Sequence, residues 1–119
     1  MLNGTNWNSV RLKIPLDDEI GWRVEFRTME IQLTADENSA YSLFIHLVTR
    51  LLHADPTLNF YIPISKLREN FTRAHQRDAL RTQKFFFRTN IHDNGAPIIE
   101  ELSVADILFG KGSFAGIFP

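Results

Sequence analysis

The clearest local pattern in the chain is the run Trp22-Arg23-Val24-Glu25-Phe26-Arg27-Thr28-Met29-Glu30-Ile31-Gln32-Leu33. Apolar and polar residues alternate strictly along it, which predicts an extended strand. The apolar residues lie on one face up to Phe26 and on the other face from Met29 onward, because side chains alternate with a period of two. The sequence therefore predicts either a bulge near Thr28 or two half-strands that pack against different neighbours.

A long helix is expected directly after this run. Thr34 and Glu37 have the spacing of a capping box, in which each side chain binds the backbone N–H of the other residue. Apolar residues then recur at helical spacing to about His53, just before Asp55-Pro56. The density of apolar residues predicts that most of this helix is buried and forms the main core element.

The other segments predict shorter elements, so the fold class is α+β. Before the run, residues 1–20 are expected to be irregular. After the long helix we expect an edge strand over 59–64 and then a helix capped by Ser65. The inward side chains of that helix are expected to be Leu67, Phe71, Ala74 and Leu80. Further along we expect a helix end or strand at 85–87, a turn at 93–95, and a helix over 102–109 that ends at Gly110. The apolar tail residues Phe114, Ile117 and Phe118 are expected to be exposed.

The composition is that of one ordinary globular domain and excludes several classes of protein. The 119 residues are 44% hydrophobic and 23% charged with a net charge of −1, which excludes a disordered chain and gives no indication of nucleic-acid or membrane binding. The absence of cysteine excludes disulfides, thiolate nucleophiles and cysteine zinc sites. No secretory signal and no stretch long enough to span a bilayer is present, so the expected location is the cytoplasm.

Charged residues at alternate positions are the best candidates for chemistry. Arg23, Glu25 and Arg27 share one face of the predicted strand, and Arg11 and Lys13 alternate in the same way upstream. One interpretation is an exposed sheet face with cross-strand ion pairs. The other is a rigid strand in a cleft, where the carboxylate suits a hard divalent cation and the guanidiniums suit carboxylates or phosphates.

Two further sets of side chains carry weaker signals. Arg73, Arg77 and Arg81 recur every four residues and would form one stripe, which indicates a solvated helix face or, as a rival, a phosphate-binding face for nucleic acid. His46 and His53 would lie about 10 Å apart along a helix, which is too far for them to share a metal ion without other ligands.

Short segments along the sequence closely resemble the catalytic subunit of eukaryotic glutamate–cysteine ligases. Essentially the whole chain is covered, and the block from Gly21 to Leu33 is the most specific part. The resemblance is carried by Thr5-Asn6-Trp7, Arg11–Pro15, Gly21–Thr34, Glu37–Tyr41, Ile62–Lys66, Glu69-Asn70, Arg73-Ala74, Gln76–Ala79, Phe87-Arg88, Gly110-Lys111 and Ile117–Pro119.

This resemblance implies an ATP-dependent ligase of glutathione biosynthesis. Such an enzyme joins the side-chain carboxylate of L-glutamate to the amino group of L-cysteine through a γ-glutamyl phosphate, with ATP and Mg²⁺ as cofactors and a modifier subunit as regulatory partner. The implied fold is part of a glutamine-synthetase-like catalytic domain, with antiparallel strands and packed helices.

The resemblance also implies roles for individual residues. Glu25 matches a magnesium ligand, and Arg27 matches a catalytic, substrate-contacting arginine. Trp7 resembles an aromatic residue of the amino-acid pocket, while Arg11 and Lys13 resemble groups near the nucleotide phosphates. Arg23 is expected to be structural and to pair within the sheet.

Family catalytic subunits are several times longer than this chain. We therefore expect residues 1–119 to be a single incomplete catalytic domain that is inactive alone, since the family's other magnesium-binding glutamates lie upstream. The alternative is a non-catalytic remnant that binds the ligase or its modifier subunit through an uncovered sheet edge.

Overall fold

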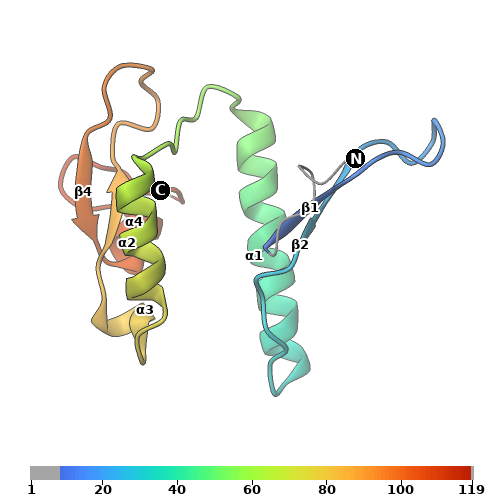
Figure 1. The fold of residues 1–119 in the computed structure, drawn as a ribbon, viewed down its shortest axis with the longest axis horizontal. Coiled ribbons are helices and arrows are strands. Elements are labelled where there is room, and N and C mark those ends of the chain that lie inside the picture. Colours follow the sequence, from blue (N-terminus) through green and yellow to red (C-terminus); the bar gives the residue numbers. More distant parts are fainter. Residues whose placement is uncertain (1–8, 119) are drawn as a thin grey trace. The chain divides into compact units, whose positions relative to one another are not determined.

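The computed structural model describes residues 9–118, which divide into two compact units on either side of Leu51, 9–51 and 52–118. We call these the N-terminal and C-terminal units and describe each by itself (Figure 1). Strands and helices are both present, so the α+β class is confirmed. The elements in chain order are β1 (Val10–Lys13), β2 (Arg23–Phe26), α1 (Ala35–Ala54), α2 (Ile64–Ala74), α3 (Ala79–Thr82), β3 (Phe85–Arg88), β4 (Ile99–Leu102) and α4 (Val104–Phe109).

The N-terminal unit begins with an antiparallel hairpin of β1 and β2. Its register pairs Val10 with Phe26 and Lys13 with Arg23. In the connecting loop, the Asp17 carboxylate accepts hydrogen bonds from the backbone N–H groups of Glu19 and Ile20, at 3.1 and 2.9 Å. The expectation that residues 1–20 are irregular was wrong for 10–13, because alternation over only four residues was too short to be recognised as a strand.

The predicted strand over 22–33 is only half formed. The ladder ends where the Arg27 N–H donates to the carbonyl of Ser9 at 2.9 Å, and residues 28–34 have no strand conformation. Instead, the backbone N–H of Gln32 donates to the side-chain oxygen of Asn38, at 3.1 Å. The change of apolar face thus marks the point where the chain leaves β1 and turns toward α1, which agrees with two halves that have different neighbours.

Helix α1 starts as predicted but is not the core. The Thr34 hydroxyl accepts from the Glu37 N–H at 3.2 Å, and the Glu37 carboxylate accepts from the Thr34 N–H at 3.1 Å, which confirms the capping box. However, no residue of this helix is buried, and Leu43 remains 58% exposed. The expectation of burial was wrong because the described part of the N-terminal unit supplies only a short segment to pack against the helix.

The hydrophobic core lies in the C-terminal unit. Strands β3 and β4 form an antiparallel hairpin in which Phe85 is opposite Leu102. One face of this hairpin contributes Phe87 and Leu102, and Phe87 packs against Phe60 and Phe114 with ring centroids 6.0 and 5.6 Å apart. The segment 59–64 was predicted to be an edge strand, but residues 59–63 are irregular and Ile64 already begins α2. Within 59–63 only the Asn59 N–H reaches a neighbouring backbone, the carbonyl of Ile91.

Helix α2 packs on the other face of this hairpin through polar side chains. The Asn70 side chain donates to the carbonyl of Phe86 at 2.9 Å and accepts from its N–H at 2.8 Å, as a neighbouring strand would. Lys66 Nζ lies 3.8 Å and Arg73 Cζ 4.4 Å from the centroid of the Phe86 ring. The inward face is therefore formed by residues 66, 70 and 73.

This packing corrects two expectations for α2. The side chains predicted to point inward are exposed, including Phe71 at 59% and Leu80, which lies outside α2. Ser65 is not the cap, because the helix starts at Ile64 after Pro63. The fixed φ of Pro63 already suits the position before a first helical turn.

The C-terminal segment closes the core. Helix α4 begins with a capping box between Ser103 and Asp106 and ends at Gly110, as predicted. The N–H groups of Ile117 and Phe118 then donate to the carbonyls of Ile107 and Leu108, which brings the tail back along the helix. Phe114 is buried at 9% exposure, and Ile117 and Phe118 are half-buried, so the expectation of an exposed tail was wrong.

Candidate functional site

The charged residues singled out in the sequence lie together on one face of the β1–β2 hairpin. Because Arg11 is opposite Glu25 and Lys13 is opposite Arg23, their side chains share a face, and Arg27 continues it by alternation. We call Arg11, Lys13, Arg23, Glu25 and Arg27 the charged face. It holds four cationic groups and one carboxylate.

Glu25 is the centre of the charged face. Lys13 Nζ lies 2.5 Å from its Oε2, and Arg27 Nε lies 2.6 Å from its Oε1. These two charge-assisted hydrogen bonds, first from Lys13 and then from Arg27, hold the pKa of Glu25 at about 2, well below its ordinary value of 4.5. The carboxylate therefore stays ionised throughout the physiological range and fixes the positions of both cations.

The remaining cations of the charged face are less engaged. Within residues 9–118, neither Arg11 nor Arg23 forms an ion pair, and both side chains are exposed. The expectation that Arg23 pairs within the sheet was wrong, because the register places it opposite Lys13 rather than opposite a carboxylate. Trp7, the predicted aromatic of the amino-acid pocket, lies outside the described residues.

The described residues do not by themselves build a metal centre. No group of three or more histidine, cysteine or acidic side chains in the range 9–118 could hold a metal ion. Glu25 supplies one carboxylate, the type of oxygen ligand that Mg²⁺ takes, but it is surrounded by cations. The residues thus fit one ligand of a magnesium ion and not a complete coordination shell.

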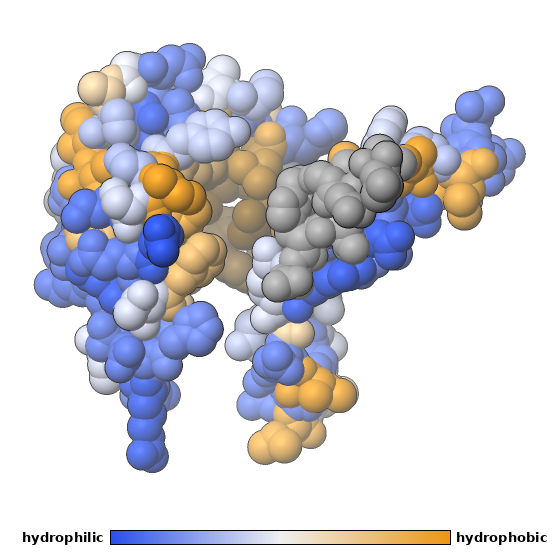
Figure 2. Space-filling view, in the orientation of Figure 1, coloured by the Kyte–Doolittle hydropathy of each residue, from blue (hydrophilic) through white to orange (hydrophobic). Residues whose placement is uncertain are grey.

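The opposite face of the hairpin is apolar and largely uncovered. Trp22 is 66% exposed, and Val24 and Phe26 are also exposed. Figure 2 shows hydrophobic residues (orange) at the surface of the hairpin tip and next to the start of α1, where Leu16, Ile31 and Leu33 are exposed. The charged face is therefore backed by apolar side chains that the described part of the chain leaves open to solvent.

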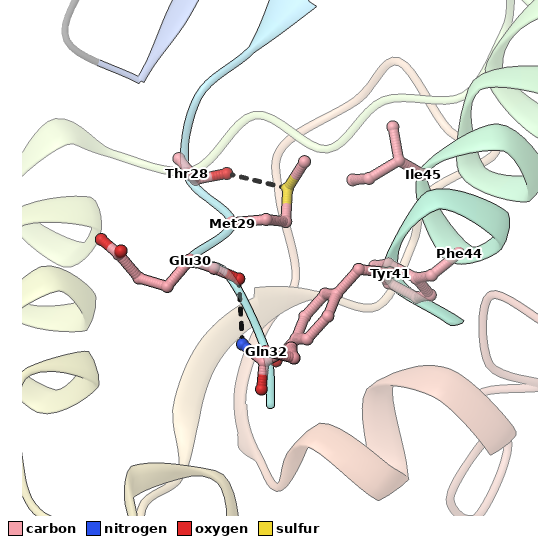
Figure 3. A pocket seen from close by; sticks show the side chains of 7 residues that line it. All are labelled: Thr28, Met29, Glu30, Gln32, Tyr41, Phe44 and Ile45. Carbon is pink, nitrogen blue, oxygen red and sulfur yellow. Dashed lines mark hydrogen bonds between the residues drawn. The ribbon is translucent and has the colours of Figure 1, made fainter. Parts of the chain in front are cut away.

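A cleft that the sequence did not reveal follows directly after Arg27. It has a volume of about 380 Å³ and lies between the segment 28–32 and the first half of α1 (Figure 3). The Thr28 hydroxyl donates to Met29 Sδ at 3.4 Å, and the Gln32 amide donates to the carbonyl of Glu30 at 2.9 Å. The lining residues are Thr28, Met29, Glu30, Gln32, Tyr41, Phe44 and Ile45.

The predicted arginine stripe does not exist as one helix face. Helix α2 ends at Ala74 and α3 begins at Ala79, so Arg73, Arg77 and Arg81 do not lie on a continuous helix. Arg73 is turned inward and binds Glu69 at 3.1 Å and Glu101 at 3.0 Å. The observation that suggested a nucleic-acid face is thus removed.

No helix within residues 9–118 is both long enough and apolar enough to cross a membrane.

Comparison with known proteins gives a consistent result across the chain. The family model described as glutamate–cysteine ligase matches residues 1–119. The chain is 52% identical over 90 residues to glutamate–cysteine ligase of Schizosaccharomyces pombe, a match that covers 75% of this chain and 13% of the relative.

Two other relatives match over nearly the full chain. Glutamate–cysteine ligase of Dictyostelium discoideum is 43% identical over 117 residues, covering 93% of this chain and 18% of the relative. The glutamate–cysteine ligase catalytic subunit of Rattus norvegicus is 45% identical over 137 residues, covering 99% of this chain and 21% of the relative. The chain thus spans between 13% and 21% of the length of these three relatives.

Proposed function

Because the chain belongs to the glutamate–cysteine ligase family, we propose that it contributes one wall of the active site of an enzyme that joins L-glutamate to L-cysteine. In this proposal the glutamate side-chain carboxylate is first phosphorylated by ATP and the cysteine amine then displaces the phosphate. The observation that carries the proposal is the charged face, which holds cations and an ionised carboxylate on a family-matched hairpin.

Arg27 is suited to bind an anionic substrate group. Its Nε is bound to Glu25 at 2.6 Å, and neither terminal nitrogen of its guanidinium forms a hydrogen bond to any residue in 9–118. Those two nitrogens can donate in parallel to a carboxylate or to a phosphoryl group. We propose that Glu25 orients Arg27 for this contact, so that little side-chain entropy is lost when the substrate binds.

Arg11 and Lys13 supply positive charge on the neighbouring strand. Fixed cations stabilise the negative charge that develops on phosphoryl oxygens during transfer, and they do so without reorganising. We propose that these two residues face the nucleotide phosphates, and that Trp7 contributes to the amino-acid pocket.

Glu25 would supply one ligand of Mg²⁺ in the complete enzyme. A bound magnesium ion would neutralise charge on the phosphate oxygens. Since the described residues offer a single carboxylate there, we expect the 119-residue chain alone to be inactive. We propose that the enzyme is located in the cytoplasm and that a modifier subunit is its regulatory partner.

The test is to replace the matching segment of the Schizosaccharomyces pombe ligase by these 119 residues and to measure γ-glutamylcysteine formation. We expect Arg27→Gln to lower kcat/KM by about 100-fold. Glu25→Gln should raise the magnesium requirement by about 10–100-fold, with partial rescue at high Mg²⁺. The control is Arg50→Gln, which removes an exposed cation of the same unit away from the charged face.

Two results would contradict the proposal. The first is turnover and magnesium dependence that Glu25→Gln and Arg27→Gln leave unchanged. The second is ADP release, dependent on both amino acids, by the purified 119-residue chain alone, because it would show that the described carboxylate is sufficient.

A further inference from the structure

The register of the β1–β2 hairpin contains an unfavourable pair. Lys13 and Arg23 are directly opposite each other on the charged face. In an antiparallel pair the Cβ atoms of opposite residues lie about 4.5–5.5 Å apart, and like charges at this distance destabilise the sheet. The only carboxylate on this face, Glu25, binds Lys13 and Arg27 and forms no ion pair with Arg23.

A general need for charged edges does not explain this arrangement. Charged side chains, lysine above all, protect an exposed strand edge from pairing with other chains, and Arg11 and Lys13 already supply such charges on β1. A glutamate at position 23 would still be a charged residue and would pair with Lys13. Four cations against one carboxylate instead produce a concentrated positive field on a short face.

We infer that Arg23 is a further anion-contacting residue of this site, and that it binds a polyphosphate chain together with Lys13 across the hairpin. A phosphate group between the two side chains accepts from both and converts their repulsion into a shared attraction. The face from position 23 to 27 is about 13 Å long, which suits a triphosphate and is short for a nucleic-acid strand. This inference rests on the proposed function and adds Arg23 to it.

The experiment measures binding of inorganic tripolyphosphate to the 119-residue chain by calorimetric titration at low ionic strength. We expect Arg23→Gln to weaken binding by about tenfold or more, since it removes charge-assisted hydrogen bonds. Arg23→Lys should retain part of the affinity, and Arg50→Gln should bind as the unchanged chain does. Affinity that is equal in Arg23→Gln, or that falls equally in Arg50→Gln, would overturn the inference, as would no binding by the unchanged chain.

A second measurement separates binding from a structural role. Without tripolyphosphate, Arg23→Gln should slow hydrogen exchange of the β1 and β2 amides, because it relieves the repulsion from Lys13. Faster exchange in this variant would instead identify Arg23 as a residue that stabilises the hairpin and would overturn the inference.

The outcome is distinguishable from failure of the proposed function. If the chimaeric enzyme has ligase activity but tripolyphosphate binding does not depend on Arg23, only the role of Arg23 is refuted. Arg23-dependent binding by the 119-residue chain, together with chimaera turnover that Glu25→Gln and Arg27→Gln leave unchanged, would refute the proposed function and leave the polyphosphate site in place.

Discussion

Glu25 organises the charged face through its two oxygens rather than through burial. Its side chain is 33% exposed, yet each of its oxygens accepts a hydrogen bond from a different cation. Lys13 lies on the neighbouring strand β1, and Arg27 lies two residues after Glu25 in the chain. The same carboxylate would have to meet a magnesium ion in the complete enzyme. If Glu25 binds magnesium as proposed, Lys13 and the metal would compete for Oε2, and contact with the phosphates would have to draw the lysine away.

The ionisation of Glu25 gives a direct test of this geometry. With a folded pKa of about 2 against an ordinary value of 4.5, Glu25 contributes stability that is present above pH 4.5 and is lost as the pH falls toward 2. Lys13→Met should raise the pKa of Glu25, because the first of its two hydrogen bonds is removed. The measurement is a carbon-detected NMR titration of the Glu25 carboxyl.

The control for this titration is Lys111→Met. Lys111 binds Asp106 in the C-terminal unit and should leave the Glu25 pKa unchanged. A Glu25 pKa that is the same with and without Lys13 would refute the ion pair in solution.

At the scale of elements, helix α2 is attached to β3 by hydrogen bonds and cation–ring contacts. Asn70 satisfies both the N–H and the carbonyl of Phe86, whose side chain is buried. Arg73 adds contacts with the carbonyl of Lys84 and the carboxylate of Glu101. The hydrogen bonds from Arg73 to Glu101 and then to Glu69 raise the pKa of Arg73 above its ordinary value. The segments Glu69-Asn70 and Arg73-Ala74, which are part of the family resemblance, therefore have a structural role here.

We expect Asn70→Ala to lower the free energy of unfolding by about 1–3 kcal/mol, because it leaves two partly buried backbone groups without a partner. Urea unfolding followed by circular dichroism measures this. Thr72→Ala, on the same helix but with an exposed hydroxyl, should change stability by less than about 0.5 kcal/mol. Equal effects of the two substitutions would contradict the role of Asn70.

At the scale of the molecule, the two units are stabilised unequally. The described hydrophobic residues that are buried, Phe86, Ile91, Leu102 and Phe114, all belong to the C-terminal unit. The N-terminal unit carries the candidate site on a hairpin without a buried hydrophobic residue in the range 9–51. Its local opening should therefore cost less free energy than opening of the β3–β4 hairpin.

Hydrogen exchange of the whole chain tests this difference. Amides of β3, β4 and α4 should exchange more slowly than those of β1 and β2. Leu102→Ala should cost about 2–5 kcal/mol in the C-terminal unit and leave exchange in β1 and β2 unchanged. Leu80→Ala, at an exposed position, is the control. Similar protection of both hairpins would refute the division.

The sequence predicted those parts of the fold that depend on neighbouring residues. The capping box at Thr34, the first half of the strand at 22–26 and the end of α4 at Gly110 follow from local hydrogen bonding and alternation. Burial was predicted poorly, because it depends on which partner an apolar face meets. Helix α1 has more apolar residues than α2, but the described segment beside it covers only a small part of its surface.

The candidate site divides in the same way. Alternation placed Arg23, Glu25 and Arg27 on one face and singled out Arg11 and Lys13 as a second pair, which the structure brings to the same face. The sequence did not reveal that Lys13 is opposite Arg23, since register depends on where β1 begins. The cleft beside α1 was also missed, because it forms between segments rather than within one.

The glycines near the end of the chain show how a structural constraint can imitate a catalytic one. A Cβ at Gly116 would lie 2.5 Å from the backbone nitrogen of Gly110, and a Cβ at Gly110 would lie 2.6 Å from the carbonyl oxygen of Phe114. Saturation mutagenesis would therefore find that both glycines tolerate substitution as poorly as the residues of the charged face. Dividing turnover by the amount of folded enzyme would separate them, since losses at the glycines should vanish while losses at Arg27 persist.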